Sequence, residues 1–238
     1  MKTRWNSQEQ EYYELRRAFL GSIEDKTQIC DDFPKYITRQ KLARYLARHK
    51  LFELILDVKG SIVECGVANG GSLLFWSQLS SVYEPFALNR EVIGFDTFQG
   101  FIDVNAVDGD NCELGDFKTN QHEIQKSIDL FDKNRALGHV QKTRLVAGDA
   151  CKTIPAFFDK HAYSLVALLV LDFDLYEPTK IAIETILPRM PKGAVIAFDE
   201  VNARQWPGET KALLDCLDMR SLQLKKFGFE PYLSYAVL

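Results

Sequence analysis

The stretch Val63-Glu64-Cys65-Gly66-Val67-Ala68-Asn69-Gly70-Gly71-Ser72 decides the fold of this chain of 238 residues. It begins as a short apolar strand that contains an acid, turns on glycines with the spacing G-x-x-x-G-G, and continues as a helix. Glycines let a backbone turn tightly and approach a ligand closely. Because the spacing differs from the G-x-G-x-x-G of dinucleotide-binding folds, a nicotinamide dehydrogenase is a weak alternative.

Short apolar runs alternate with helical stretches on the carboxyl side of Gly60. This alternation predicts βαβ units and a parallel sheet. The expected strands are Ser61–Cys65, Val92–Phe95, Thr143–Ala147, Ser164–Leu171 and Ala194–Phe198, followed by a closing pair within Phe227–Leu238 around Pro231. The expected helices are Gly71–Ser80, Gln121–Leu137, Ile154–Lys160, Thr179–Met190 and Glu209–Leu217.

Two amphipathic helices are expected before the sheet, one through Tyr12 to Ile23 and one over Thr38–Val58. We therefore predict a helical extension or lid at residues 1–59 and one α/β domain at residues 60–238. The basic stretch Arg39 to Lys50 is interleaved with apolar residues, which predicts a solvated helix face. The long polar segment Ile102–Thr119 is expected to be a mobile loop beside the site.

Composition narrows the classes of function. The formal net charge is −4 without a strong run of either sign, which argues against nucleic-acid binding. No run approaches the roughly 18–20 apolar residues that cross a bilayer. The polar N-terminus and five scattered cysteines predict a cytoplasmic protein with reduced thiols. The sequence is compatible with a homo-oligomer but does not define the oligomeric state.

Every expected core strand ends in a carboxylate. Ligands of open parallel sheets bind beyond the carboxyl ends of the strands, so acids gathered there predict a binding site. Helix capping is the alternative; it explains Asp149 well and could explain Asp96. Capping explains poorly why every one of these strands is followed by an acid. The acids are Glu64, Asp96, Asp149, Asp172 with Asp174, and Asp199 with Glu200.

An acidic strand end beside a glycine turn suits a cationic ligand better than a pyrophosphate. S-adenosylmethionine carries an ammonium and a sulfonium, so we expect Glu64 to face its methionine portion. Asp96 would accept hydrogen bonds from the ribose hydroxyls, and Asp149, with Ala150 beside it, would meet the adenine amino group. The expected fold is a Rossmann-like class I methyltransferase sheet: mostly parallel, seven-stranded, with an antiparallel closing strand and an N-terminal helical extension.

Three motifs resemble the macrocin O-methyltransferase family, which includes sugar O-methyltransferases of antibiotic pathways. They are Val63–Ser72, the turn Phe95-Asp96-Thr97-Phe98-Gln99-Gly100, and Leu171-Asp172-Phe173-Asp174-Leu175-Tyr176-Glu177-Pro178-Thr179. The resemblance covers roughly residues 33–217. It implies that the protein uses S-adenosylmethionine and Mg²⁺ or another divalent cation to methylate a hydroxyl of a small-molecule or glycan acceptor.

The resemblance also implies roles for individual residues. Asp172, Asp199 and Glu200 would bind the metal, and Asp174 matches the position of a general base. The cofactor-binding residues would be Glu64, Gly66, Ser72, Asp96 and Asp149, with Thr38 in an N-terminal stretch folded over the cofactor.

The chain departs from the family pattern in places. Phe173 replaces a common glycine, and Glu200 replaces a common aspartate. The stretch Trp206-Pro207-Gly208-Glu209-Thr210 either borders the acceptor site or is only a helix start with Glu209 in the first turn.

The chemistry does not depend on the family. Hard carboxylate oxygens suit magnesium, which could bind vicinal hydroxyls and lower the pKa of one. Two alternatives stay open. One is metal-dependent methylation of a catechol-like or other vicinal diol. The other is a protein that binds S-adenosylmethionine without chemistry, or a relative of the cephalosporin-hydroxylase-like branch.

Overall fold

The computed structural model describes residues 7–238, which divide into two compact units, the first ending at Ala43 and the second beginning at Arg44. The first unit contains α1 (Ser7–Gly21), α2 (Thr27–Asp31) and α3 (Phe33–Tyr36). Within it the Phe19 and Tyr36 rings stack at 5.7 Å, and Arg16 donates to the Tyr36 carbonyl over 3.1 Å. The predicted boundary at residues 59/60 and the predicted lid role remain predictions.

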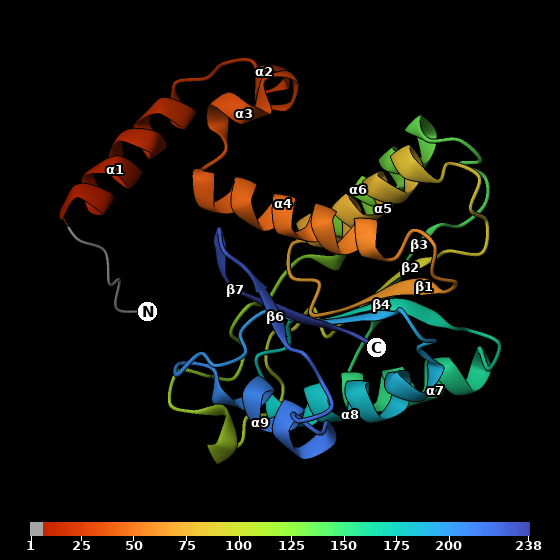
Figure 1. The fold of residues 1–238 in the computed structure, drawn as a ribbon. Coiled ribbons are helices and arrows are strands. Elements are labelled where there is room, and N and C mark those ends of the chain that lie inside the picture. The colour runs from red at the N-terminus through yellow and green to blue at the C-terminus, as the bar shows by residue number, and fades with distance from the viewer. Residues whose placement is uncertain (1–6) are drawn as a thin grey trace. The chain divides into compact units, whose positions relative to one another are not determined.

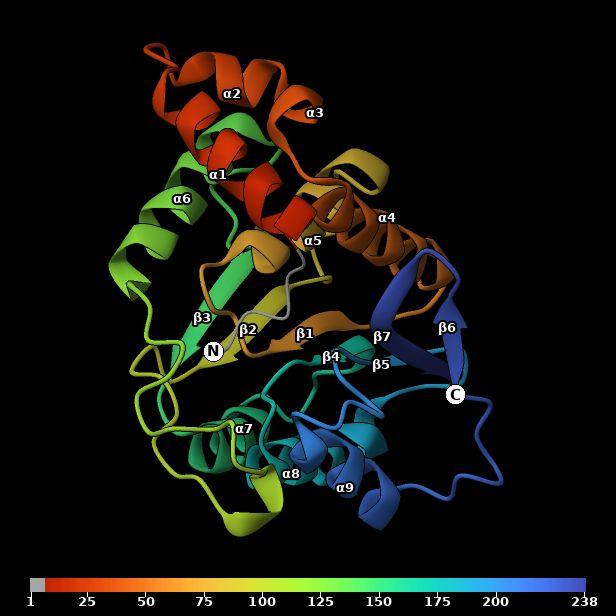
Figure 2. The same ribbon diagram turned by 90° about the vertical axis from the view of Figure 1, so that its left-hand side faces the viewer.

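The second unit is a seven-stranded sheet with helices on both faces (Figures 1 and 2). Its strands are β1 (Ser61–Cys65), β2 (Val92–Asp96), β3 (Thr143–Ala147), β4 (Val166–Leu171), β5 (Val195–Phe198), β6 (Lys225–Phe227) and β7 (Glu230–Val237). Its helices are α4 (Arg39–Leu54), which begins in the first unit, then α5 (Gly71–Tyr83), α6 (Gln121–Asn134), α7 (Ala150–Lys160), α8 (Tyr176–Ile186) and α9 (Pro207–Cys216), with short 3₁₀ turns at Ala106–Asp108 and Leu187–Arg189.

Alternating side chains of the strands fill two cores. In β1, Ile62 packs with residues of α4, α5 and α6 on one face, and Val63 packs with residues of α7, α8 and α9 on the other. Burial on both faces explains why these strands read as nearly continuous apolar runs. Among the helices of residues 7–238, none combines the length and apolar character needed to cross a bilayer.

The strand order is β3-β2-β1-β4-β5-β7-β6, with β7 antiparallel to β5 and the pairs from β3 to β5 parallel. The chain winds outward from β1 to β3 and then crosses back to place β4 beside β1. The direction of winding therefore reverses between β1 and β4, where open α/β sheets bind ligands.

The closing strands differ in detail from the prediction. Pro231 was expected between them, but it lies within β7, and the turn is formed by Gly228 and Phe229. Proline fits near the start of β7 because the pairing of β7 with β5 begins only at Ser234.

Candidate active site

The glycine turn after β1 lies directly against the end of β4. Gly66 has φ +92°, and a Cβ atom there would lie 2.0 Å from the Asp172 carbonyl oxygen. The Asp172 N–H donates to the Cys65 carbonyl over 2.8 Å, so the β1–β4 ladder continues past the strand ends. Only glycine combines this backbone conformation with this close approach.

Asp96, at the end of β2, holds this turn in place. Its Oδ2 accepts the N–H groups of Val67 (2.8 Å) and Ala68 (2.9 Å), and its Oδ1 accepts the N–H of Phe98 over 2.7 Å. The carboxylate thus ties the loop after β1 to the loop after β2. Its contact with ribose remains a prediction, and Oδ1 keeps room for a further donor.

Glu64 is buried at the end of β1, and its Oε2 has no hydrogen-bond partner among the described residues. Burial raises the pKa of Glu64 to about 7, opposed by the charge of Arg48 and by a hydrogen bond with Ser72. Arg48 Nε in turn donates to Ser72 Oγ over 2.7 Å. Two residues that were predicted to bind the cofactor, Glu64 and Ser72, therefore lie together. Arg48 lies beside them, although the sequence did not predict it as a site residue.

Asp149 caps α7, as the alternative interpretation held. Its Oδ1 accepts the Cys151 N–H over 3.0 Å, and Lys152 Nζ lies 2.9 Å from Oδ2. The hydrogen bond from Lys152, followed by that from Cys151, lowers the pKa of Asp149. Ala150 is buried in the core under α7. Their predicted contacts with adenine remain predictions.

Thr38 belongs to the first unit. Its Oγ1 accepts the Lys41 N–H over 3.2 Å and its carbonyl accepts the Leu42 N–H, so it starts α4. The predicted contact of Thr38 with the cofactor remains a prediction.

The acids after β4 and β5 form one cluster, in which Asp199 is buried and the others are half-buried. Burial, together with neighbouring carboxylates, raises the pKa of Asp174 to about 7 and that of Glu200 to about 8. Burial, Asp199 and Asp174 together raise the pKa of Asp172 well above its usual range. The backbone of Asp174 is left-handed, with φ +62°. Carboxylates that share a buried site in this way call for a cation or for protons.

Arg44 and Arg48 on α4 are the cations that face this cluster. Arg44 forms an ion pair with Asp199 Oδ2, and Arg48 Nη2 lies 3.7 Å from Asp199 Oδ1. Arg48 is only 6% exposed. The prediction that this basic stretch is a solvated face is therefore wrong for these two residues, although Lys50 is exposed. Their i, i+4 spacing, in line with the buried Phe52, was the available signal.

Glu209 starts a helix, as one of the two interpretations held, and it also contacts the turn after β5; that this stretch borders the acceptor site remains a prediction. Glu209 lies in the first turn of α9 and is 0% exposed. Its Oε1 accepts the Glu200 N–H over 3.1 Å, and its Oε2 is buried without a partner in the described part of the chain. Burial raises the pKa of Glu209 well above its usual range.

The segment expected to be a mobile loop is anchored to α8 and α9. Asp108 is 1% exposed; its Oδ1 accepts the Tyr176 N–H at the start of α8 over 2.6 Å, and its Oδ2 accepts the Asn105 N–H over 2.8 Å. The Phe117 ring lies 6.0 Å from that of Trp206, beside the start of α9. The segment therefore holds the two helices that follow the acidic strand ends.

The residues that were predicted to bind a metal are Asp172, Asp199 and Glu200. Among residues 7–238, no three His, Cys, Asp or Glu side chains are gathered in an arrangement that would hold an ion. Their chemistry nevertheless fits a hard cation, because Asp199 Oδ1 and Glu200 Oε2 are buried oxygens that have no hydrogen-bond partner within residues 7–238. Arg44 and Arg48 are the cations that Asp199 contacts among the described residues.

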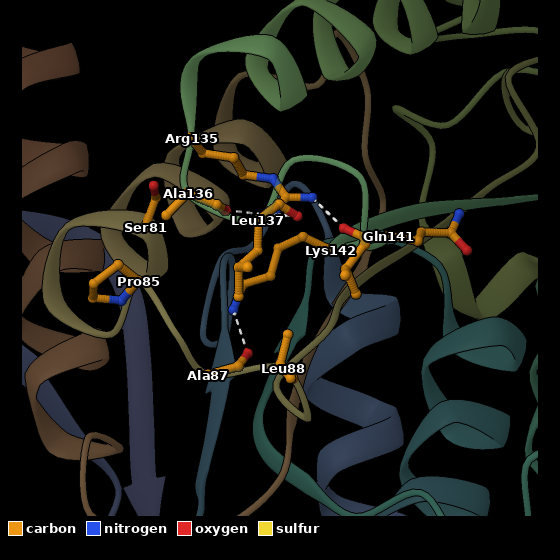
Figure 3. A pocket seen from close by; sticks show the side chains of 10 residues that line it. Ser81, Pro85, Ala87, Leu88, Arg135, Ala136, Leu137, Gln141 and Lys142 are labelled. Carbon is orange, nitrogen blue, oxygen red and sulfur yellow. Dashed lines mark hydrogen bonds between the residues drawn. The ribbon is translucent and has the colours of Figure 1, made fainter.

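A small cavity of about 10 Å³ lies at the other edge of the sheet, before β2 and β3 (Figure 3). Lys142 and Arg135 border it, and both donate to backbone carbonyls, Lys142 Nζ to Ala87 over 2.9 Å. The space is sufficient for about one water molecule. This cavity has no part in the site described above.

Comparison with known proteins agrees with the fold and with the predicted family. The chain matches the macrocin-O-methyltransferase (TylF) family over residues 26–220. It is 26% identical over 154 residues to the 8-demethyl-8-(2,3-dimethoxy-alpha-L-rhamnosyl)-tetracenomycin-C 4'-O-methyltransferase of Streptomyces olivaceus, an alignment that spans 60% of this chain and 53%, about half, of that protein.

Solved structures agree over nearly the whole chain. The calicheamicin methyltransferase CalS11 superposes with a TM-score of 0.93 and 32% identity, covering 99% of this chain and 94% of CalS11. An apo structure of CalS11, described as a TDP-rhamnose 3'-O-methyltransferase of calicheamicin biosynthesis, superposes with a TM-score of 0.86 and 29% identity. This match covers 99% of this chain and 96% of that CalS11 chain. The predicted class I methyltransferase sheet is thereby confirmed. The chain belongs to the macrocin-O-methyltransferase family, whose members are O-methyltransferases.

Proposed function

We propose that this protein is an S-adenosylmethionine-dependent, divalent-cation-dependent methyltransferase that acts on a hydroxyl of a sugar, either as a nucleotide sugar or on a glycosylated natural product. The observation that carries the proposal is the division of the carboxyl edge of the sheet. The glycine turn and Glu64 lie at the end of β1, and the acidic cluster lies at the ends of β4 and β5. The two groups flank the point where the strand order reverses.

The β1–β3 half of this edge binds the methyl donor. When bound, S-adenosylmethionine supplies an electrophilic methyl group on sulfur. Glu64 accepts a hydrogen bond from the ammonium, and Gly66 lets the donor approach the backbone closely. Asp96 Oδ1, which accepts the Phe98 N–H in this structure, would accept a further hydrogen bond from a ribose hydroxyl. Ser72, Asp149 and Ala150 complete this half as the motifs predict.

The β4–β5 half binds the acceptor. Asp174 takes the proton of the attacking hydroxyl, and its pKa of about 7 suits a general base near neutral pH. General-base assistance of this kind contributes about 10²–10⁴-fold. Asp172, Asp199 and Glu200 would hold a divalent cation, which when bound would lower the pKa of the acceptor hydroxyl.

A deoxyhexose of the rhamnose type is the acceptor that the relatives support best. CalS11 is described as acting on TDP-rhamnose, and the Streptomyces olivaceus enzyme methylates a rhamnosyl group. These two relatives methylate different positions, 3' and 4', so we propose the sugar class without a position.

The test is a measurement of S-adenosylhomocysteine formation from S-adenosylmethionine with TDP-rhamnose, a rhamnosylated aromatic polyketide and catechol as separate acceptors. Each reaction is run with 5 mM Mg²⁺ and with EDTA, on the wild-type protein and on Asp174→Asn, with Asp159→Asn as an exposed control on α7. We expect sugar methylation that EDTA abolishes and that Asp174→Asn reduces at least 100-fold. Faster methylation of catechol than of either sugar, or full activity in EDTA, would refute the corresponding part of the proposal. Calorimetry that detects no S-adenosylmethionine binding would refute all of it.

A further inference from the structure

Glu209 is a buried carboxylate to which neither the proposed cofactor site nor the proposed base assigns a role. It lies in the first turn of α9, at a position 0% exposed. Its Oε1 accepts one hydrogen bond, from the Glu200 N–H, and its Oε2 accepts none in the described structure. An acid in such a place is costly unless it serves a neighbour, because burial disfavours the charge and leaves half of the group unsatisfied.

The first turn of α9 is held rigidly against the segment that carries Asp174. A Cβ atom at Gly208 would lie 2.8 Å from the Asp174 carbonyl oxygen and 2.7 Å from the Tyr176 nitrogen. Helix and segment therefore approach each other closely, and the Asp108 carboxylate lies at the same contact, because its Oδ1 would be 2.5 Å from the same Cβ atom. This contact fixes Glu209, the next residue, relative to Asp174.

Two consecutive side chains of α9 hold the turn after β5. Glu209 Oε1 accepts the Glu200 N–H over 3.1 Å, and Thr210 Oγ1 accepts the Asn202 N–H over 2.9 Å. Asp199 and Glu200 are the two carboxylates presented by this turn. Glu209 therefore binds the peptide N–H between these two residues, whereas Thr210 binds the N–H of Asn202, two residues farther along.

We propose that Glu209 is a positioning residue for the Asp199–Glu200 carboxylate pair: by accepting the Glu200 N–H it sets the direction in which both side chains leave the strand end. The proposal rests on the proposed function, in which this pair holds a divalent cation. Ligating carboxylates elsewhere depend on such hydrogen-bonded supports, whose loss typically lowers metal affinity by about 10–100-fold.

The experiment compares Glu209→Gln and Glu209→Leu with Thr210→Val as a matched control. Glutamine at position 209 keeps a carbonyl oxygen that can accept the Glu200 N–H, and leucine has no such acceptor. Valine at position 210 removes the hydrogen bond that Thr210 accepts from the Asn202 N–H in the same turn. Mn²⁺ affinity is measured by electron paramagnetic resonance on the protein alone, and exchange of the Glu200 amide hydrogen is followed by NMR.

We expect Glu209→Leu to weaken Mn²⁺ binding about 10–100-fold and to speed exchange of the Glu200 amide. Glu209→Gln and Thr210→Val should stay within about threefold of the wild-type Mn²⁺ affinity. Wild-type affinity in the leucine variant, or an equal loss in the glutamine and leucine variants, would overturn the proposal. If the wild-type protein binds no Mn²⁺, the cation part of the proposed function fails. Amide exchange then decides the role of Glu209 alone: unchanged exchange in Glu209→Leu overturns it.

Discussion

Replacing Gly66 with alanine tests whether the close contact between β1 and β4 builds the site. A Cβ atom at this position would lie 2.0 Å from the Asp172 carbonyl oxygen, whereas ordinary contact begins near 3.4 Å. The two atoms must therefore separate by about 1.4 Å. A displacement of that size moves Asp172, one of the proposed metal ligands, relative to the glycine turn that faces the methyl donor.

The expected loss in the free energy of unfolding has two parts, which a control variant separates. Alanine at φ +92° carries about 1–2 kcal/mol of backbone strain, and forcing an extra carbon into a packed contact adds about 1–3 kcal/mol. Gly115 has a similar φ of +86° with nothing within 4 Å of a Cβ atom. Gly115→Ala should therefore show the strain alone, and Gly66→Ala should lose about 2–5 kcal/mol in total.

The assay is urea unfolding followed by tryptophan fluorescence, together with the methyl-transfer rate at saturating donor. A displacement of about 1 Å at a reacting centre costs on the order of 100-fold in rate. We expect that loss in Gly66→Ala and a near-normal rate in Gly115→Ala. If the two variants unfold within 0.5 kcal/mol of each other and retain similar rates, the contact does not build the site.

Two further predictions follow from buried carboxylates. The pKa of Glu64 is raised from 4.5 to about 7, so the folded protein holds a proton that the unfolded chain releases above about pH 4.5; stability from this group is present below that pH and lost by about pH 7. Urea unfolding of Glu64→Gln should show a smaller fall over this range, to which Asp174 and Glu200 still contribute, and a pH dependence equal to that of the wild type would contradict the assignment. Asp108→Ala should lower the free energy of unfolding by about 2–4 kcal/mol, because Asp108 accepts two backbone N–H groups, including that of Tyr176. Thermal unfolding unchanged from the wild type would show that the anchor is dispensable.

The parts of the structure that follow from local pattern were predictable from the sequence. Runs such as Val166–Leu171 are apolar on both faces, and only the interior of a parallel sheet buries both. Once the sheet is parallel, acids that follow the strands must meet at one edge, which placed Asp172 and Asp199 together. The ends of elements were less predictable: β4 begins two residues later than expected, because the Ser164 N–H still donates to the His161 carbonyl in the turn after α7.

Contacts between distant segments were not predictable in the same way. Asp108 stabilises the start of α8 from 68 residues away, and nothing in its polar surroundings distinguishes it from a loop acid. Arg48 was misassigned because a cation among apolar residues usually extends to solvent. Its position in line with Phe52 indicated burial, but its partner, Asp199, could be identified only from the packing of α4 beside β5.

The charge balance of the site explains why arginines and acids share this edge. Asp199 is 3% exposed, and a buried carboxylate must be neutralised, paired or bound to a metal. In this structure Arg44 pairs with it, and the remaining acids form no ion pair with the described residues, with pKa values raised to about 7 at Asp174 and about 8 at Glu200. Under the proposed function the resident arginine and a bound cation are alternative solutions to one electrostatic problem. Under that proposal, Arg44 would balance the charge of Asp199 while no cation is bound. The same imbalance keeps Asp174 able to accept a proton near neutral pH, so the burial that makes the cluster costly also provides its chemistry.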